Sequence, residues 1–506
     1  MGNFNTTRKE LKNYIFARVP LVIINSSERE RVERMLRSIG QEMNIEIACY
    51  TDSRQVYHLY GSVTKDVDGD PLPFIAEQFR NRRGVTFVLG DVRRISEENL
   101  YSREILNILY LAMEQACTLL LVTPDPVWSR LSRFGMVTVL DYPDAKERYK
   151  QIHKFTERFG SRYQIDWEEE DYLKASALTR GFSEVQIENI LSSVLVENGK
   201  LGKDHVYALA SQKSRMYTAV PCVQEVQVPK NLHVSGLDKL KQWIKKKKTI
   251  FYIPEEELEK RQLATPKGIL LAGVPGCGKS YSARMVASEW NLPLYRFDIG
   301  DVYDKWVGES ERKMREALTF IDNVAPCVVW IDEIEKALSV SDSGNDTGKR
   351  VLGQFLFWLQ ESSSRVFLVA TANDVQKLPP ELFRKGRFSE IFFVDLPNRE
   401  ERKEAIRQYI SRCLGRMIPE DEMKIYVDAS EGFSYADIEY VIKAAADIEL
   451  LNGNRPVHME TILTMFQQVL PFEKSNPETV ERIRAWGRNR AIAASKEIIN
   501  EGGEMV

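Results

Sequence analysis

A glycine-rich segment at residues 273–280 constrains the fold of this 506-residue chain more than any other feature. It reads Gly-Val-Pro-Gly-Cys-Gly-Lys-Ser, follows an apolar run at residues 268–272, and precedes a helix-forming stretch at residues 281–290. A strand, a glycine-rich loop and a helix in this order are typical of a phosphate-binding loop, because glycines let the backbone wrap closely around an anion. The segment therefore predicts an α/β domain in which a buried parallel strand leads into the loop.

The residues of this segment have expected roles around a triphosphate. Backbone N–H groups of the loop and of the helix N-terminus would face the phosphates. Lys279 would reach the β- and γ-phosphates, and Ser280 would hold Mg²⁺. A chance glycine-rich turn is the alternative, but the flanking strand and helix argue against it. The expected nucleotide-binding residues here are Gly273, Val274, Pro275, Gly276, Cys277, Gly278, Lys279, Ser280 and Tyr281.

A second apolar run, at residues 327–331, ends in the paired acids Asp332 and Glu333. Ligands collect at the carboxyl ends of strands in open α/β sheets, so these acids are placed for phosphate chemistry. Asp332 is expected to bind Mg²⁺ together with Ser280, and Glu333 to orient and activate the attacking water. A strand followed by an acidic turn has no such meaning alone, but this one lies downstream of a phosphate-binding loop.

Polar residues after a third predicted strand, at residues 366–370, extend the candidate site. The amide of Asn373 could contact the γ-phosphate or its water, although an isolated Asn at this point could also be a turn residue. Arg384 and Arg387 follow, three positions apart. They are either solvated charges or arginine fingers that reach the γ-phosphate held by a neighbouring subunit, and the second role requires an oligomer.

Taken together, these motifs resemble those of AAA ATPases, a group within the AAA+ superfamily. Residues 273–280 resemble Walker A, residues 328–333 resemble Walker B, and Asn373 resembles sensor 1. Residues 378–388 resemble the second region of homology, whose paired arginines correspond to Arg384 and Arg387. The resemblance implies ATP and Mg²⁺ as cofactors and a parallel sheet flanked by helices, followed by an α-helical lid. The implied catalytic residues are Lys279, Asp332, Glu333, Asn373, Arg384 and Arg387.

The adenine side of the site follows from the same resemblance. Residues 432–438 resemble the lid motif that contacts adenine through Ala436, although Tyr435 stands where the family usually has glycine. Gly236 and Leu237 resemble the start of the domain, which also lines the base.

A closer resemblance links the chain to an AAA family of cyanobacteria and algal plastid genomes. It rests on residues 326–336, 358–361 and 384–397. The family usually has Asp where this chain has Ser389. This closer resemblance implies no particular substrate.

The first half of the chain repeats the plan of the second half without its phosphate chemistry. Residues 137–148 align with residues 391–402, and residues 181–188 align with residues 432–439. After the counterpart of the first strand there are no glycines and no lysine, and Glu28 would repel phosphate. We therefore interpret this half as a degenerate AAA-like α/β module with its own small helical lid that does not hydrolyse ATP. An unrelated α/β domain with coincidental similarity is the alternative.

Two further features belong to this organisation. Arg130 and Arg133 keep the spacing of the paired arginines, and we interpret them as an interface or as plain surface. The predicted domains are a degenerate AAA-like module at residues 1–210, a linker at 211–231, a large ATPase subdomain at 232–398, a helical lid at 399–470 and a helical tail at 471–506.

Composition excludes several classes of protein. The net charge is −3, and the lysine run at residues 245–248 ends a predicted helix, where cations are favourable, so nucleic acid is not an expected partner. The six cysteines form no Cys-x-x-Cys pair, and no His-Glu-x-x-His motif of a zinc protease occurs. No apolar run reaches bilayer length and the N-terminus has no signal-like core, so we expect a cytoplasmic protein without a membrane partner.

Residues 304–311 resemble AAA pore loop 1, and residues 341–348 fall where AAA proteins place a second pore loop. The resemblance implies that Lys305, Trp306 and Val307 face the channel of a homo-oligomeric, hexameric ring, with Trp306 gripping a protein substrate. A core position for Trp306 is the alternative. The expected function is therefore ATP-driven remodelling or unfolding of proteins. A nucleotide-dependent assembly or regulatory factor that threads nothing is the alternative, and a nucleic-acid motor is a less favoured one.

Overall fold

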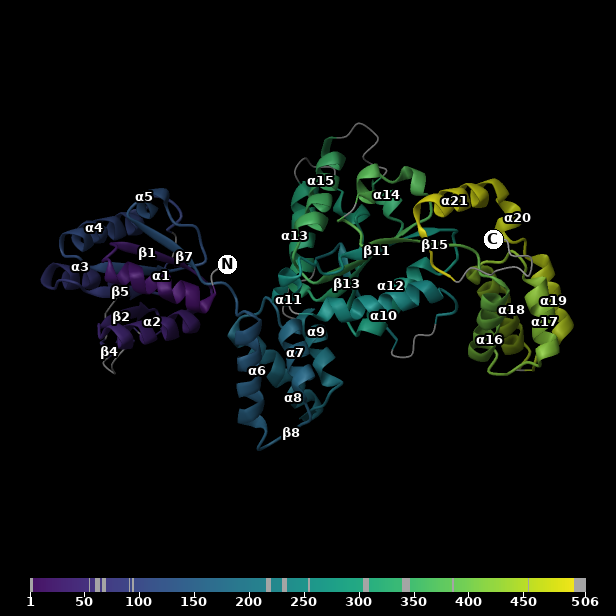
Figure 1. Cartoon of the computed structure of the whole chain (residues 1–506), viewed down its shortest axis with the longest axis horizontal. Helices are drawn as coiled ribbons and strands as arrows, with labels where there is room; N and C mark the ends of the chain where they lie inside the picture. Colours follow the sequence, from purple (N-terminus) through teal and green to yellow (C-terminus); the bar gives the residue numbers. More distant parts are fainter. Residues whose placement is uncertain are drawn as a thin grey trace. The chain divides into compact units, whose positions relative to one another are not determined.

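The computed structural model of the chain divides into two compact units, each with its own sheet (Figure 1). The first comprises Met1–Ile165 with Thr179–Lys200, and the second comprises Asp166–Leu178 with Leu201–Val506. The structure describes residues 3–53, 55–59, 64–65, 70–90, 92, 95–214, 220–229, 234–253, 255–303, 309–338, 346–384, 386–453 and 455–495.

The first unit is built on a seven-stranded sheet in the order β4-β3-β2-β5-β6-β1-β7. Its central strands pair in parallel, and β3 and β4 extend one edge in antiparallel fashion. The central strands β2, β5, β6 and β1 are apolar and buried because helices cover both faces of a parallel sheet. Their bounds are β1 Leu21–Asn25, β2 Ile47–Thr51, β3 Gln55–His58, β4 Thr64–Lys65, β5 Thr86–Leu89, β6 Thr118–Val122 and β7 Gly135–Val139.

Two apolar cores lie on the two faces of this sheet. Helices α1 and α2 cover one face, where Leu11 and Met35 pack against Val22. Helices α3 and α4 cover the other, where Phe79 and Leu109 belong to the same core as strand residues of β1, β5 and β6. The helices of the unit are α1 Phe4–Phe16, α2 Arg29–Met43, α3 Pro71–Asn81, α4 Leu100–Glu114, α5 Ser129–Ser132, α6 Ala145–Phe159 and α8 Glu184–Asn198. A separate two-stranded sheet joins β8 (Gln164–Ile165) and β9 (Lys200–Leu201).

The second unit also has a seven-stranded sheet, in the order β10-β12-β13-β14-β11-β15-β16. Strands β11 to β15 pair in parallel, and β10 adds an antiparallel edge. The three strands predicted from apolar runs, β11, β13 and β14, form where expected. The strands of this sheet are β10 Val223–Val226, β11 Gly268–Gly273, β12 Leu294–Phe297, β13 Cys327–Ile331, β14 Val366–Ala372, β15 Glu390–Val394 and β16 Ile492–Ala493.

Helices lie on both faces of this second sheet (Figure 1). On one face, α13 and α15 supply Met314 and Phe355 to an apolar core. On the other, α10 and α12 place Trp290 on the ring of Phe367, with ring centroids 4.4 Å apart. The helices are α7 Glu169–Leu178, α9 His205–Ser214, α10 Asp238–Tyr252, α11 Glu255–Lys260, α12 Lys279–Trp290, α13 Glu309–Val324, α14 Ile334–Leu338, α15 Asp346–Glu361, α16 Arg399–Cys413, α17 Glu420–Ala429, α18 Tyr435–Leu451, α19 Met459–Gln468, α20 Phe472–Ser475 and α21 Pro477–Arg490, with short 3-10 turns η1 Gly300–Val302, η3 Val375–Lys377 and η4 Pro380–Phe383.

The two units share one strand order. In the first, the parallel core reads β2-β5-β6-β1-β7, and in the second it reads β12-β13-β14-β11-β15. Numbering each set along the chain gives the same order in both. The helices after the last core strands also match, because α6 and α16 begin with capping boxes, as do α8 and α18. The first half therefore repeats the architecture of the second half, as the sequence predicts.

Some segments differ from a simple reading of the sequence. Within the predicted linker at residues 211–231, the structure places the end of α9 and the strand β10, which pairs with β12. Helices α7 and α9, which the sequence analysis groups with the first module, cluster with the second unit.

The C-terminal segment packs onto the sheet of the second unit. Helix α21 lies along β15, where Gly487 fits so closely on Phe393 that an added Cβ would lie 2.4 Å from its ring. The short strand β16 pairs in parallel with β15, and Leu240 N–H donates to the carbonyl of Ala494. Arg484 binds both carboxylate oxygens of Asp395, at 3.0 and 2.9 Å. The segment predicted only as a helix-prone tail therefore completes the sheet edge.

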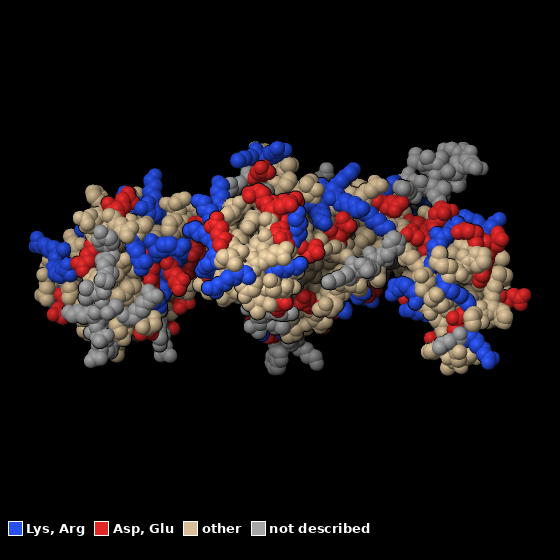
Figure 2. All heavy atoms as spheres, turned by 90° about the horizontal axis from the view of Figure 1, so that it is seen from below, with Lys and Arg blue, Asp and Glu red and all other residues tan. Residues whose placement is uncertain are grey.

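Charges of both signs are interspersed on the face shown in Figure 2. Within the lysine run, Lys247 lies over the ring of Trp243, and Lys248 Nζ donates to the carbonyl of Glu289 at the end of α12. Two of the four lysines therefore have structural roles, one by packing over an aromatic ring and one by a hydrogen bond at a helix end. Among the described residues, no helix is both long and apolar enough to cross a bilayer.

Candidate functional site

The predicted site residues meet at one edge of the second sheet. Strands β13, β14 and β11 are neighbours and run in parallel, so their carboxyl ends lie side by side. The glycine-rich loop follows β11, Asp332 and Glu333 follow β13, and Asn373 follows β14. Strand pairing thus gathers three segments that are far apart in the sequence.

The glycine-rich loop leads directly into α12. Gly278 is the N-cap of this helix with a φ of 83°, and Gly276 has a φ of 76°. Both lie in the left-handed region, where a side chain is unfavourable, so glycine suits these positions. The loop delivers the first backbone N–H groups of α12 to the sheet edge, where they can bind an anion.

Lys279, the first residue of α12, is buried beneath the loop. Its Nζ donates to the carbonyls of Gly273 and Val274, at 2.9 and 2.7 Å. Burial lowers the pKa of this ammonium to about 8, and nearby carboxylates only partly oppose the shift. An anion bound beside this buried ammonium would stabilise its positive charge.

Asp332 joins the loop helix to the neighbouring strand. Its Oδ1 accepts hydrogen bonds from the hydroxyl of Ser280, at 2.8 Å, and from the hydroxyl of Thr371, at 2.6 Å. Thr371 Oγ1 in turn accepts the backbone N–H of Glu333 at 2.9 Å. Ser280 and Asp332, both predicted Mg²⁺ ligands, are therefore in direct contact.

Glu333 and Asn373 are also brought together, as the sequence predicts. Asn373 Nδ2 donates to Glu333 Oε1 at 2.8 Å. Glu333 itself has a φ of 46°, in the left-handed region that a non-glycine residue rarely adopts. Such backbone strain concentrates at functional sites, and here it aims the carboxylate at the amide of Asn373. Lys336 forms an ion pair with the other carboxylate oxygen.

Thr371 and Glu335 were missed by sequence reasoning. Glu335 is buried, and its Oε1 accepts the backbone N–H groups of Asn373 and Asp374 at 3.0 and 3.4 Å. It therefore holds the turn that carries Asn373. The available signals were a third acid just after the paired acids, and a hydroxyl residue at the end of the third strand.

The proposed adenine side lies where the lid meets the start of the domain. Gly236 has a φ of 65°, and a Cβ there would lie 2.3 Å from Glu401 Oε1. Glu401 Oε1 accepts the N–H of Leu237 at 3.3 Å, and the Tyr435 hydroxyl donates to the carbonyl of Ser235 at 3.4 Å.

The unexpected Tyr435 thus ties the lid helix α18 to the start of the domain. Beside it, the N–H of Ala436 donates to the carbonyl of Gly276 at 3.3 Å, so the lid also contacts the glycine-rich loop. Tyr281 lies in the first turn of α12, partly buried, under the guanidinium of Arg284, 5.8 Å from the ring centroid.

The two predicted finger arginines have different surroundings. Arg384 is exposed, immediately after η4. Arg387 is partly buried and its guanidinium donates to the carbonyl of Glu381, which ties it to the turn. Arg384 is thus the one presented to solvent. The predicted pore residues Lys305, Trp306 and Val307 lie outside the described residues.

The donor set fits Mg²⁺ and a triphosphate. Mg²⁺ prefers hard oxygen ligands and is usually held by one or two protein groups together with phosphate oxygens. The adjacent Ser280 hydroxyl and Asp332 carboxylate supply such a pair, and the helix N-terminus and Lys279 supply the anion-binding groups. The residues present therefore fit both partners.

Comparisons with known protein families agree with this reading. Residues 269–396 match the model of the ATPase family associated with various cellular activities (AAA). Residues 7–140 match the model of the SpoVK-like AAA ATPase N-terminal domain. The second match covers the sheet of the first unit.

Individual relatives cover nearly the whole chain or a little more than half of it. The uncharacterized AAA domain-containing protein ycf46 of Guillardia theta is 31% identical over 493 residues, which are 94% of each chain. A proteasome-activating nucleotidase of Sulfurisphaera tokodaii is 30% identical over 56% of this chain and 75% of its own length. The ATP-dependent zinc metalloprotease FtsH of Thermus thermophilus is 28% identical over 55% of this chain and 45% of its own length.

The lowered pKa of Lys279 predicts a pH-dependent affinity for nucleotide. Below about pH 8 the ammonium is already charged in the free protein, so binding a triphosphate needs no proton. Above this pH a proton must be taken up on binding, and the dissociation constant should rise about tenfold between about pH 7 and pH 9. Equilibrium titration with a non-hydrolysable ATP analogue measures it. Lys279→Arg, which stays charged, is the control, and an equally flat profile in both proteins would contradict the prediction.

Proposed function

Because the chain belongs to the AAA family that includes the plastid ycf46 proteins, we propose that it hydrolyses ATP and uses the energy to remodel or unfold a protein substrate. The observation that supports hydrolysis most directly is the convergence at one sheet edge of a buried lysine, a hydroxyl–carboxylate pair and a carboxylate–amide pair. These residues are Lys279, Ser280, Asp332, Glu333 and Asn373.

Each group has a task in phosphoryl transfer, which depends mainly on positioning and charge stabilisation. Lys279 and the N-terminus of α12 hold the phosphates. Glu333 orients the attacking water and accepts its proton, and Asn373 fixes the carboxylate through the hydrogen bond described above. Mg²⁺, held by Ser280 and Asp332 when bound, would supply neutralisation of phosphate charge.

We propose that the site is completed by a neighbouring copy of the chain in a homo-oligomeric ring, which the family resemblance suggests to be a hexamer. Arg384 is exposed at the end of a 3-10 turn, a position from which a side chain can reach another subunit. An arginine supplied to a γ-phosphate stabilises the charge of the transition state. Arg387, tied to its own turn by Glu381, would hold this segment in shape.

A protein is the proposed substrate class. Two relatives support it by name, one as a nucleotidase that activates the proteasome and one as an ATP-dependent metalloprotease. This chain lacks the His-Glu-x-x-His motif, so the proposal concerns remodelling and not proteolysis. Trp306 would grip the substrate, as the resemblance to pore loop 1 implies.

Glu333→Gln tests the hydrolytic step. Removing the carboxylate charge should lower kcat for ATP hydrolysis at least 100-fold, as expected for loss of a general base, while ATP affinity changes less than about threefold. Phosphate release and equilibrium nucleotide binding measure the two quantities. Glu361→Gln, at the end of α15 and away from the site, is the matched control. Hydrolysis at the wild-type rate would refute the assignment.

Arg384→Ala tests the shared site. The variant alone should lose ATP hydrolysis by about 10³-fold, as loss of an arginine finger does. When it is mixed with Lys279→Ala subunits, activity should return in part, because an intact lysine and an intact arginine then meet at some interfaces. Phosphate release across mixing ratios measures this. Absence of any recovery in mixtures would argue against sites shared between subunits.

Arg387→Ala should lower the thermal stability of the protein, because the hydrogen bond from Arg387 to the carbonyl of Glu381 is lost.

Trp306→Ala distinguishes a threading motor from an assembly factor. The substrates for this test are the proteins that stay bound to the Glu333→Gln variant, which should bind ATP with little hydrolysis. In a threading motor, Trp306→Ala should keep more than half of the ATPase rate but no longer unfold these substrates. In an assembly factor, ATP hydrolysis and binding of the partner protein should both persist, because such a factor threads nothing. Tyr440→Ala, an exposed aromatic residue on α18, is the control. Retained unfolding by Trp306→Ala would overturn the threading proposal and leave hydrolysis untouched.

A further inference from the structure

The first unit has a buried arginine where the second unit has its nucleotide site. Helix α2 follows β1 after a loop of residues 26–28, as α12 follows β11 after residues 274–278. Arg31 is the third residue of α2. Its side chain is only 2% exposed, although a charged side chain is almost never buried unless it is paired.

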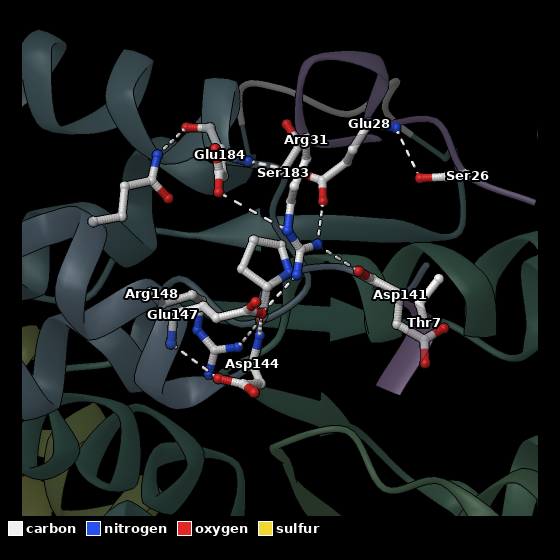
Figure 3. Close-up of polar contacts among 12 residues, drawn as sticks. Thr7, Ser26, Glu28, Arg31, Asp141, Asp144, Glu147, Arg148, Ser183 and Glu184 are labelled. Carbon is white, nitrogen blue, oxygen red and sulfur yellow. Dashed lines mark hydrogen bonds and ion pairs between the residues drawn. The ribbon is translucent and has the colours of Figure 1, made fainter. Parts of the chain in front are cut away.

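Arg31 binds groups from four different segments (Figure 3). Nη1 donates to Glu28 Oε2 at 2.5 Å and to the carbonyl of Asp141, after β7, at 2.6 Å. Nη2 donates to Glu147 Oε2 in α6 at 2.6 Å, and Nε lies 3.9 Å from Glu184 Oε1 in α8. One guanidinium therefore connects the loop after β1 and the end of β7 to both lid helices of its unit.

These lid positions correspond to those that border the adenine side in the second unit. Glu147 is the third residue of α6 and closes its capping box, as Glu401 does in α16. Glu184 is the first residue of α8, as Tyr435 is the first residue of α18. In the second unit, Glu401 and Tyr435 bind the segment that contains Gly236 and Leu237. In the first unit, their counterparts bind Arg31.

Glu28 lies in the loop that corresponds to the glycine-rich loop of the second unit. It is buried, is the N-cap of α2, and its Oε1 accepts the N–H of Glu184 at 2.8 Å. A carboxylate thus satisfies the N-terminus of α8, a place that favours an anion. From the sequence we expect Glu28 to repel phosphate, and in the structure its two carboxylate oxygens accept hydrogen bonds from Arg31 and from the first N–H of α8.

A buried ionic cluster of this kind is a poor source of net stability. The desolvation of the charges offsets most of their attraction, and apolar residues of similar volume often stabilise as well or better. What the cluster does provide is direction, because each hydrogen bond fixes the position of one segment relative to the guanidinium. The contacts therefore suit a device that holds a lid in one place.

We propose that Arg31 is an internal substitute for nucleotide in the first unit: it holds α6 and α8 closed on the sheet without ATP, and it leaves no site for a nucleotide to bind. The unit would then stay in one conformation through every stage of ATP turnover in the second unit. That the lid helices of the second unit respond to nucleotide is part of the proposed function, and the comparison between the two lids rests on it. The closed position of α6 and α8 in the first unit does not depend on the proposed function.

Hydrogen exchange on the full chain without nucleotide tests the closure. In Arg31→Met, amides of α6 and of the N-terminal turn of α8 should exchange at least tenfold faster, while amides of β1, β5 and β6 keep their rates. Arg34→Met is the matched control, because Arg34 lies on the same helix and pairs with Glu184 at the exposed surface. It should change these rates less than about threefold. Equal acceleration in lid and sheet, or none, would overturn the proposal.

Milder variants cover the case in which Arg31→Met does not fold. Glu147→Gln and Glu184→Gln each remove one charged partner of Arg31, and both glutamate side chains are about a quarter exposed, so the changes are mild. Each should raise exchange in its own helix, α6 or α8, by more than in the other. Arg31→Lys keeps the charge but cannot span all four segments, so it should also loosen the lid. Unchanged exchange in all three variants would refute the closure.

A nucleotide titration tests the second half of the proposal. With a non-hydrolysable ATP analogue, the wild-type chain should bind one nucleotide, α16 and α18 should gain protection, and α6 and α8 should not change. Lys279→Ala should bind none. A nucleotide retained by Lys279→Ala, or added protection of α6 and α8, would overturn the proposal. If the wild-type chain binds no nucleotide at all, the proposed ATPase function fails, and exchange without nucleotide still decides the role of Arg31.

Discussion

One carboxylate oxygen, Oδ1 of Asp332, joins the segments from which the nucleotide site is made. It accepts the hydroxyl hydrogen of Ser280, in the helix after the glycine-rich loop, and that of Thr371, on the neighbouring strand. Because Thr371 also receives the backbone N–H of Glu333, the strained turn after β13 is held by the same group of atoms. Lys279 depends on this arrangement as well, since its buried ammonium is placed by the loop that Ser280 anchors. The chemistry of the site is thus built from short polar contacts across parallel strands whose order places their ends together.

The two units show that the same architecture can carry different chemical groups at the same place in the fold. Both use the same order of five parallel strands and lid helices with the same capping pattern. At the start of the helix after the first core strand, the two units carry different side chains. In one unit glycines and a lysine stand there, and in the other a buried glutamate and a buried arginine neutralise each other. Fold alone therefore predicts a scaffold, and the charged groups at one helix N-terminus decide what that scaffold can bind.

The sequence predicts those parts of the site that are encoded in short contiguous motifs. Lys279, Ser280, Asp332 and Glu333 could be assigned because their spacing within a strand–loop–helix unit reflects the chemistry itself. Thr371 and Glu335 could not, since their roles depend on the register between β13 and β14. The role of Arg31 could not be predicted for the same reason, because its partner Glu147 lies 116 positions away in the sequence. The two-residue strand β16 is too short to give any periodic signal, and only the pairing with β15 defines it.

The pairing of β16 with β15 also bears on how the catalytic unit can be dissected. An unpaired edge strand is a template for association with other chains, and here residues 492–493 cover that edge while α21 covers Phe393. The carbonyl of Ala494 also accepts the N–H of Leu240, close to Gly236 and Leu237 at the start of the domain. A fragment cut at the end of the last lid helix would lose all of these contacts at once. A fragment of the second unit must therefore extend through Ala494 to keep these contacts.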